Sequence, residues 1–151
     1  MTDKRAQVRG MLARWATAIP EVKRLERDRL ECERLRDDIR DSTRISRNSG
    51  SSGGSGSGDI SDLVGKVIER VDVYDQRIKQ IDELIAQKLE LRSVVDVAVS
   101  TLPELQQQIV TLRYKERKNW VAIGMQVYCS EGHAKRLEAA AVDALAERLI
   151  K

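Results

Sequence analysis

Apolar residues spaced alternately four and three positions apart constrain the fold of this chain more than any other feature. The repeat lies in residues 59–100 and consists of Ile60, Val64, Val67, Val71, Tyr74, Ile78, Ile81 and Ile85. Such heptads place one apolar seam along a single long helix, as in a coiled coil. The stripe fails at Lys88 and restarts at Leu91, Val94, Val95 and Ala98, a phase slip that locally unwinds a coil. Two partners for the seam stay open: a second copy of the chain, or N-terminal helices of the same chain.

The N-terminal segment predicts a helical hairpin over residues 1–41. Its first helix spans residues 4–18 and carries an apolar stripe at helical spacing: Val8, Met11, Leu12, Trp15 and Ile19. We expect Trp15 to anchor this helix, and Pro20 to end it and open the next. The second helix, which runs to about Asp41, has only a thin apolar stripe, so it needs a partner to be stable in water.

Residues 42–58 are rich in Ser and Gly and predict a flexible linker. The chain therefore divides into a hairpin (1–41), this linker (42–58), a long oligomerising helix (59–100) and a C-terminal domain (101–151). Every periodic segment has helical spacing, so we predict an all-α fold.

Composition argues against several classes of protein. Charged residues make up 34% and aromatic residues 3%, which suits long amphipathic helices and not a platform for stacking single-stranded nucleic acid. Cys32 and Cys129 lie far apart, which argues against a zinc site and fits a reducing cytoplasm. No apolar run approaches the ~20 residues of a membrane span. We therefore expect a soluble, cytoplasmic protein. One His, and no P-loop or nucleophile elbow, predict that it is not an enzyme and needs no cofactor.

The small net charge of +3 is unevenly distributed. Lys and Arg outnumber Asp and Glu by 13 to 9 in residues 1–47 and by 8 to 6 in residues 102–151, whereas residues 59–101 hold 6 against 9. The basic segments at both ends of the chain can bind the phosphate backbone of a nucleic acid, with an affinity that depends on salt. Solvated helix faces explain the same charges without any partner.

The C-terminal domain predicts two short helices, a tight turn and a third helix. Leu102-Pro103-Glu104 opens the first, Asn119 caps the second after a basic loop, and Ser130 caps the third. The second helix buries Trp120, Ile123 and Val127, and the third buries Ala134, Leu137, Ala141, Leu145 and Leu149. This layout is typical of a helix-turn-helix whose last helix enters the DNA major groove.

Candidate DNA contacts follow from that layout. On the front of the last helix they are Ser130, Glu131, Gly132, His133, Lys135 and Arg136, and in the preceding loop they are Lys115, Arg117 and Lys118. Arg136 is the first choice, because a guanidinium can fork onto guanine or bind a phosphate. The alternative is an Arg136 that pairs with Glu131 or Glu138 on the surface. The loop charges are equally well explained as phosphate clamps or as solvated side chains.

The same segment resembles the fourth region of bacterial sigma factors and, more closely, phage-encoded ArpU/RinA-like late-gene transcription regulators. The resemblance covers about the last 50 residues and rests on Leu102-Pro103-Glu104, Leu112-Arg113-Tyr114, Trp120-x-x-Ile123-Gly124, Ser130-x-x-His133-x-x-Arg136-Leu137 and Ala141-Val142-x-x-Leu145. It implies promoter DNA as ligand and RNA polymerase as a possible partner.

Four positions depart from the pattern of that family. A small residue, most often Ala, is usual where Gly124 stands, which is a mild change. Gly is common where this chain has Arg117 and Tyr128, and a Tyr at positive φ would be strained, so we expect the turn to be built differently. A polar or basic residue is common at the position of Gly132, so one potential base contact is missing.

The sequence therefore predicts a sequence-specific double-stranded DNA-binding transcriptional regulator of phage or prophage late genes, acting as a homo-oligomer. Two alternatives remain. One is a phage small terminase-like packaging subunit, which is also helical and binds DNA. The other is a coiled-coil adaptor with no DNA role, in which the basic ends serve solubility alone.

Overall fold

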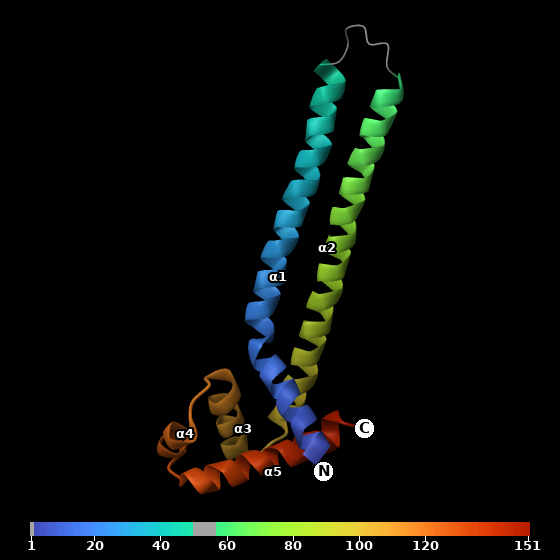
Figure 1. The fold of residues 1–151 in the computed structure, drawn as a ribbon. Coiled ribbons are helices and arrows are strands. Elements are labelled where there is room, and N and C mark those ends of the chain that lie inside the picture. Colours follow the sequence, from blue (N-terminus) through green and yellow to red (C-terminus); the bar gives the residue numbers. More distant parts are fainter. Residues whose placement is uncertain (1, 50–56) are drawn as a thin grey trace. The chain divides into compact units, whose positions relative to one another are not determined.

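The chain is built from helices in every element that the structure, a computed structural model, describes over residues 2–49 and 57–151. In chain order these are α1 (Thr2–Ser49), α2 (Ser57–Ser100), α3 (Glu104–Val110), a π-helical turn η1 (Thr111–Lys115), α4 (Trp120–Val127) and α5 (Glu131–Leu149) (Figure 1). The prediction of an all-α fold is confirmed. The chain forms two compact units, one of residues 1–21 with 87–151 and one of residues 22–86.

Two predicted boundaries near the N-terminus are wrong. α1 continues through Pro20, so the described residues from Thr2 to Asp41 lie in one helix and do not form a hairpin. A proline inside a helix removes one hydrogen bond and costs about 3 kcal/mol, which burial of apolar side chains on both sides, such as Trp15 and Leu25, offsets. The helices also extend into the predicted linker, up to Ser49 and again from Ser57. Its remaining part, residues 50–56, lies outside the described residues.

The unit of residues 22–86 is an antiparallel pair made by α1 and α2. Leu25, Cys32, Ile78 and Ile81 form its buried cluster, and Tyr74 and Ile85 pack against them. From Tyr74 to Ile85 the seam of the heptad repeat is therefore covered within the chain, which is one of the two alternatives that the sequence left open. Self-association remains a prediction.

Two ion pairs flank Cys32 in this unit and fix its register. Arg29 Nε lies 2.7 Å from Asp82 Oδ1, and Arg36 Nη1 lies 2.9 Å from Asp75 Oδ1. Exposed pairs add little stability. They do favour one alignment, because a shift of α1 along α2 would separate both pairs at once.

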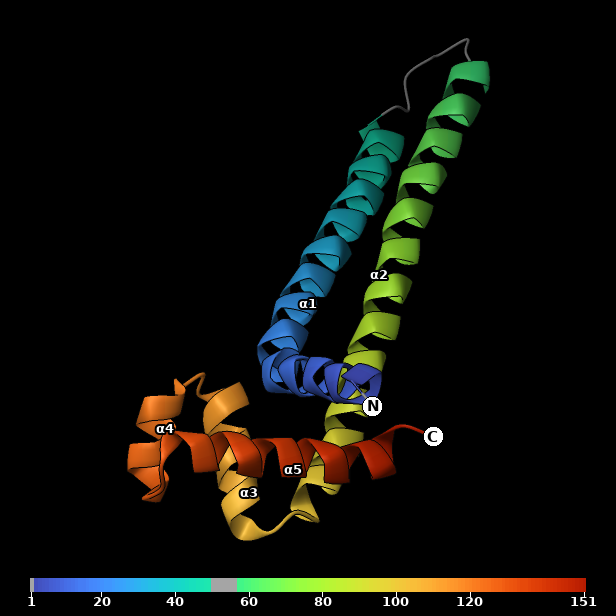
Figure 2. The same cartoon turned by 60° about the horizontal axis from the view of Figure 1, so that its bottom comes forward.

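The core of the other unit brings the start of α1 against the end of α2 and against α5. Figure 2 shows the first turns of α1 running alongside the C-terminal part of α5, in the opposite direction. The core residues are Val8, Leu12, Trp15, Val95, Ala98, Val99, Leu102, Val110, Ala141, Val142, Leu145 and Ala146. Trp15 is 3% exposed, and its Nε1 donates to Asp96 Oδ1 at 2.6 Å, so its predicted role as the anchor of the first helix is confirmed.

A buried carboxylate joins three elements of this unit. The Glu138 side chain on α5 is 5% exposed. Arg9 of α1 donates to both of its oxygens, at 3.0 and 3.1 Å, and the Tyr114 hydroxyl of η1 donates to Oε1 at 3.1 Å. Burial first, and the Glu138 charge second, raise the pKa of Tyr114 to about 12. An ionised Glu138 is stable in the core only with these donors.

We predict that Arg9→Ala lowers the free energy of unfolding by about 2–3 kcal/mol, because it leaves the Glu138 charge buried without its partner. Arg5→Ala is the matched control. Arg5 forms a similar two-bond pair with Asp143, at 2.7 Å for each bond, but on the surface. Its loss should hardly change stability. Urea denaturation measures both, and equal losses for the two variants would contradict the special role of the buried pair.

The raised pKa of Tyr114 predicts a specific alkaline loss of stability. Because the folded state holds the proton more tightly than the unfolded state, this contribution is complete below pH 10 and is lost as pH rises through about 12. Tyr114→Phe should lack this component. Urea denaturation from pH 9 to 12 tests it, and parallel stability curves for the two proteins would overturn it.

Candidate nucleic-acid interface

Two capped helices with a short turn between them form the candidate interface. Asn119 Oδ1 accepts from Ala122 N at 2.8 Å at the start of α4, and Ser130 Oγ accepts from His133 N at 3.1 Å at the start of α5. Both predicted caps are confirmed. Three residues, 128–130, separate the helices.

A small core holds α3, η1, α4 and α5 together. It contains Ile109, Leu112, Ile123 and Ala134, with Trp120, Val127, Cys129 and Leu137 packed against it. Of the predicted inner faces of α4 and α5, Ile123, Ala134, Ala141 and Leu145 are buried, whereas Trp120, Val127, Leu137 and Leu149 are half-buried. The π-helical turn is marked by the bond from Glu116 N to Thr111 O at 3.1 Å.

The turn between α4 and α5 places Tyr128 at positive φ, so the expectation that it would be built differently is wrong. Tyr128 has φ 57° and ψ 46°, in the left-handed region, and it caps α4 there. Arg117 in the preceding loop also has a positive φ, 54°. These are the two positions where the resembling family often has Gly. The left-handed region costs a side-chain-bearing residue roughly 1–2 kcal/mol. At 95% exposed, the Tyr128 ring makes little contact within the chain to offset that cost.

The close approach of the turn to α4 explains Gly124. A Cβ at this position would lie 2.7 Å from the carbonyl oxygen of Cys129, which no ordinary contact allows. The same segment is held by the bond from Cys129 N to Gly124 O at 2.9 Å. The expectation that Gly for Ala is a mild change here is wrong, since this turn leaves no room for a methyl group.

We predict that Gly124→Ala lowers the free energy of unfolding by about 1–3 kcal/mol, because the turn has to move to admit the methyl group. Gly132→Ala, at the second residue of α5, is the control. Its nearest neighbour would be Arg136 Nη1 at 3.8 Å, so helix propensity should raise stability by about 0.5 kcal/mol. Thermal denaturation measures both, and a Gly124→Ala variant as stable as the parent would refute the contact.

The front of α5 is exposed and presents one cation without an acidic partner. Lys135 Nζ lies 3.3 Å from Glu131 Oε1, four residues earlier. Glu138 is held by Arg9 and Tyr114. Both acids that might neutralise Arg136 are therefore engaged elsewhere, and within the described residues Arg136 forms no ion pair. Ser130, Gly132 and His133 are also exposed on this front.

The three cations of the loop before α4 differ in whether they have partners within the chain. Lys115 Nζ lies 4.2 Å from the centre of the Trp15 ring, and Lys118 Nζ donates to Gln126 Oε1 at 2.9 Å. Both of these predicted phosphate contacts therefore also serve the fold. Arg117 is exposed, and in the described part of the chain it has no ion pair or hydrogen bond.

Arg113 was not among the candidate site residues predicted from the sequence. Its guanidinium lies 4.7 Å from the centre of the Trp120 ring, and Nη1 donates to Lys118 O at 3.2 Å. In the sequence this residue is only the centre of the motif Leu112-Arg113-Tyr114. Its position beside the loop follows from the π-helical turn, which no periodicity in the sequence indicates.

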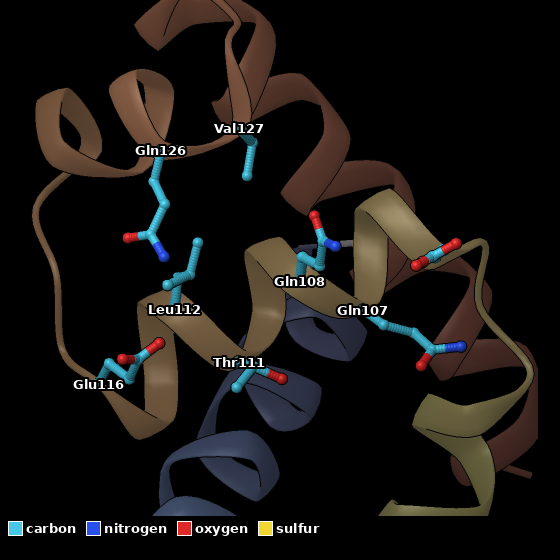
Figure 3. A pocket seen from close by; sticks show the side chains of 8 residues that line it. Gln107, Gln108, Thr111, Leu112, Glu116, Gln126 and Val127 are labelled. Carbon is cyan, nitrogen blue, oxygen red and sulfur yellow. The ribbon is translucent and has the colours of Figure 1, made fainter.

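A hollow of about 530 Å³ lies on another side of the same module, between α3, η1 and α4. Figure 3 shows Gln126 and Val127 pointing into it from α4, toward Leu112 and Gln108. Its remaining lining residues are Glu104, Gln107, Thr111 and Glu116. Amides and two carboxylates line it without a cation, so it does not suit a phosphate.

Two other kinds of feature, a metal site and a membrane span, are absent from the described residues. No three His, Cys, Asp or Glu side chains gather there in a way that could hold a metal ion. None of the helices in that part of the chain is both long and apolar enough to cross a membrane.

The fold and the site define an all-α protein with a compact C-terminal module of capped helices. The chain belongs to the DUF722 family, described as a protein of unknown function, whose model matches residues 67–147. The match runs from α2 into α5 and thus includes the whole turn between α4 and α5. Comparisons with curated proteins and with solved structures gave no match.

Proposed function

We propose that this protein binds double-stranded DNA sequence-specifically, with α5 in the major groove, and regulates transcription. The observation that carries the proposal is the front of α5, where Arg136 is exposed and has no ion pair with any residue that the structure describes. A helix of this kind meets base edges with its N-terminal residues. A free guanidinium can donate two parallel hydrogen bonds to guanine O6 and N7.

The flanking side chains support the same orientation. His133 and Lys135 are exposed on the first turns of α5, and an ammonium suits a phosphate. Arg117 in the preceding loop offers another cation to the backbone. Phosphate contacts of this type fix the register of a protein on DNA, and base contacts then provide specificity.

The resemblance to sigma region 4 and to ArpU/RinA-like regulators supports a role at promoters. Among the residues that carry it, Leu112, Ile123, Ala141 and Leu145 are buried, and Arg136 is exposed. This division between core and surface is what a DNA-binding module of that type requires. We therefore propose phage or prophage late genes as targets, and RNA polymerase as a partner.

We further propose that the protein acts as a homo-oligomer on two half-sites. The seam of α2 packs against α1 from Tyr74 to Ile85, so self-association along this stretch would use other positions. Val73 and Leu84, which are 63% and 44% exposed on α2, are the kind of side chain that a second copy would cover.

We predict that selection from random duplex DNA with the intact protein, at near-physiological salt, recovers one motif. Arg136→Ala should blur one position of it and weaken binding about 10-fold or more, because a forked contact to guanine is lost. Arg148→Ala removes an equal charge from the last turn of α5 and should leave the motif unchanged.

Three outcomes would contradict this proposal in different ways. Salt-sensitive binding without any motif would indicate backbone contacts alone, as in a packaging subunit. No retention of duplex DNA would leave the adaptor alternative. An unchanged motif with Arg136→Ala would exclude this residue from base recognition.

A further inference from the structure

A second hollow, of about 290 Å³, lies where the start of α1 meets η1 and the loop after it. Its lining residues are Ala13, Thr17, Arg113, Tyr114 and Arg117. Two guanidinium groups and two hydroxyl groups thus share one small space, and no carboxylate lines it. The two guanidinium groups suit an oxyanion, because they provide planar, charged donors. The hydroxyl groups add no donor, because that of Tyr114 already donates to Glu138 Oε1 and that of Thr17 to Ala13 O.

Both arginines keep donors available for a ligand. Arg113 stacks on Trp120 and makes one hydrogen bond, to Lys118 O. A guanidinium has five N–H donors, so most of its capacity remains. Arg117 is exposed, and within the residues described it has no ion pair or hydrogen bond. The stacking on Trp120 holds the Arg113 guanidinium in place before any ligand arrives.

The backbone at Arg117 points to a role outside the fold. Its φ of 54° lies in the left-handed region, which is costly for a residue with a side chain, and no hydrogen bond or ion pair of that side chain in the described residues offsets the cost. Strained residues of this kind cluster at functional sites. A Gly would satisfy the same backbone without strain, so the arginine side chain itself needs another reason.

A neighbouring hollow extends the cationic lining toward α5. It measures about 350 Å³ and is lined by Arg9, Arg113, Tyr114, Trp120, Lys135 and Glu138. The two hollows share Arg113 and Tyr114. Its single carboxylate, Glu138, is already neutralised by Arg9. Cations therefore follow one another from the front of α5, past Arg113, to Arg117 beside α1.

We propose that the hollow between Thr17, Arg113 and Arg117 binds a phosphate group. The phosphate would come either from the backbone of duplex DNA or from a free nucleotide. The first source rests on the proposed function, and it would make α1 part of the DNA interface. The second source does not depend on DNA binding, and the two are distinguishable by experiment.

The test uses the full chain with two changes at position 117. Arg117→Gly removes the charge and relieves the left-handed strain, and Arg117→Asn removes the charge but keeps a residue that tolerates this backbone. Neither should unfold the protein, and Arg117→Gly should raise its melting temperature. Arg148→Gln is the control, with the same loss of charge at the far end of α5.

The first arm measures affinity for duplex DNA as a function of salt. Loss of one phosphate contact should weaken binding severalfold and lower the slope of log affinity against log salt by about one. The second arm titrates inorganic phosphate and ATP in separate experiments, followed by NMR shifts of the amides of residues 111–118. Saturable shifts that Arg117→Gly abolishes would indicate a free phosphate ligand.

Each outcome decides the question. A reduced salt slope in both Arg117 variants, but not in Arg148→Gln, supports the site with DNA as source. Phosphate- or ATP-dependent shifts with an unchanged DNA slope support it with a free nucleotide as source. Unchanged behaviour of both Arg117 variants in both arms overturns it. If the parent protein fails to bind duplex DNA, the proposed function fails, and the second arm still tests the hollow.

Discussion

The buried carboxylate of Glu138 is the interaction on which the C-terminal module depends. It is an acid on the inner side of α5, and it is stable there because Arg9 and Tyr114 donate three hydrogen bonds to it. Those donors come from α1 and η1, which are far apart in the sequence. The ionised group therefore fixes the positions of three elements at once, with a directional precision that apolar packing alone does not give.

This arrangement also decides which charges of the module are available to a ligand. Glu138 and Glu131 are engaged by Arg9 and Lys135, respectively, and Arg136 forms no ion pair in the described part of the chain. The buried pair of Arg9 and Glu138 thus keeps the Glu138 carboxylate away from the exposed cations of α5. The exposed cation on α5 is a consequence of the fold, and it is the basis of the proposed DNA contact.

A second constraint lies in the tight turn before α5. The chain reverses within three residues, with Tyr128 in the left-handed region and with the carbonyl of Cys129 directly over Gly124. The usual place for Gly in such a turn is the left-handed position itself. Here the Gly lies on the helix that the turn approaches, and it provides space and not backbone freedom. The turn therefore tolerates backbone strain at the exposed Tyr128, but it leaves no room for a methyl group at the buried Gly124.

The sequence by itself determined the helices, their caps and their apolar faces. These follow from local spacing and from short-range hydrogen bonds, such as those at Asn119 and Ser130, which need no distant partner. Only the tertiary structure decided that α1 passes through Pro20, that the seam of α2 packs against α1, and that residues 1–21 belong with the C-terminal module. It also brought Thr17 beside Arg113 and Arg117. Periodicity shows that a face will be buried, but the partner is set by packing and charge pairing between residues far apart in the chain.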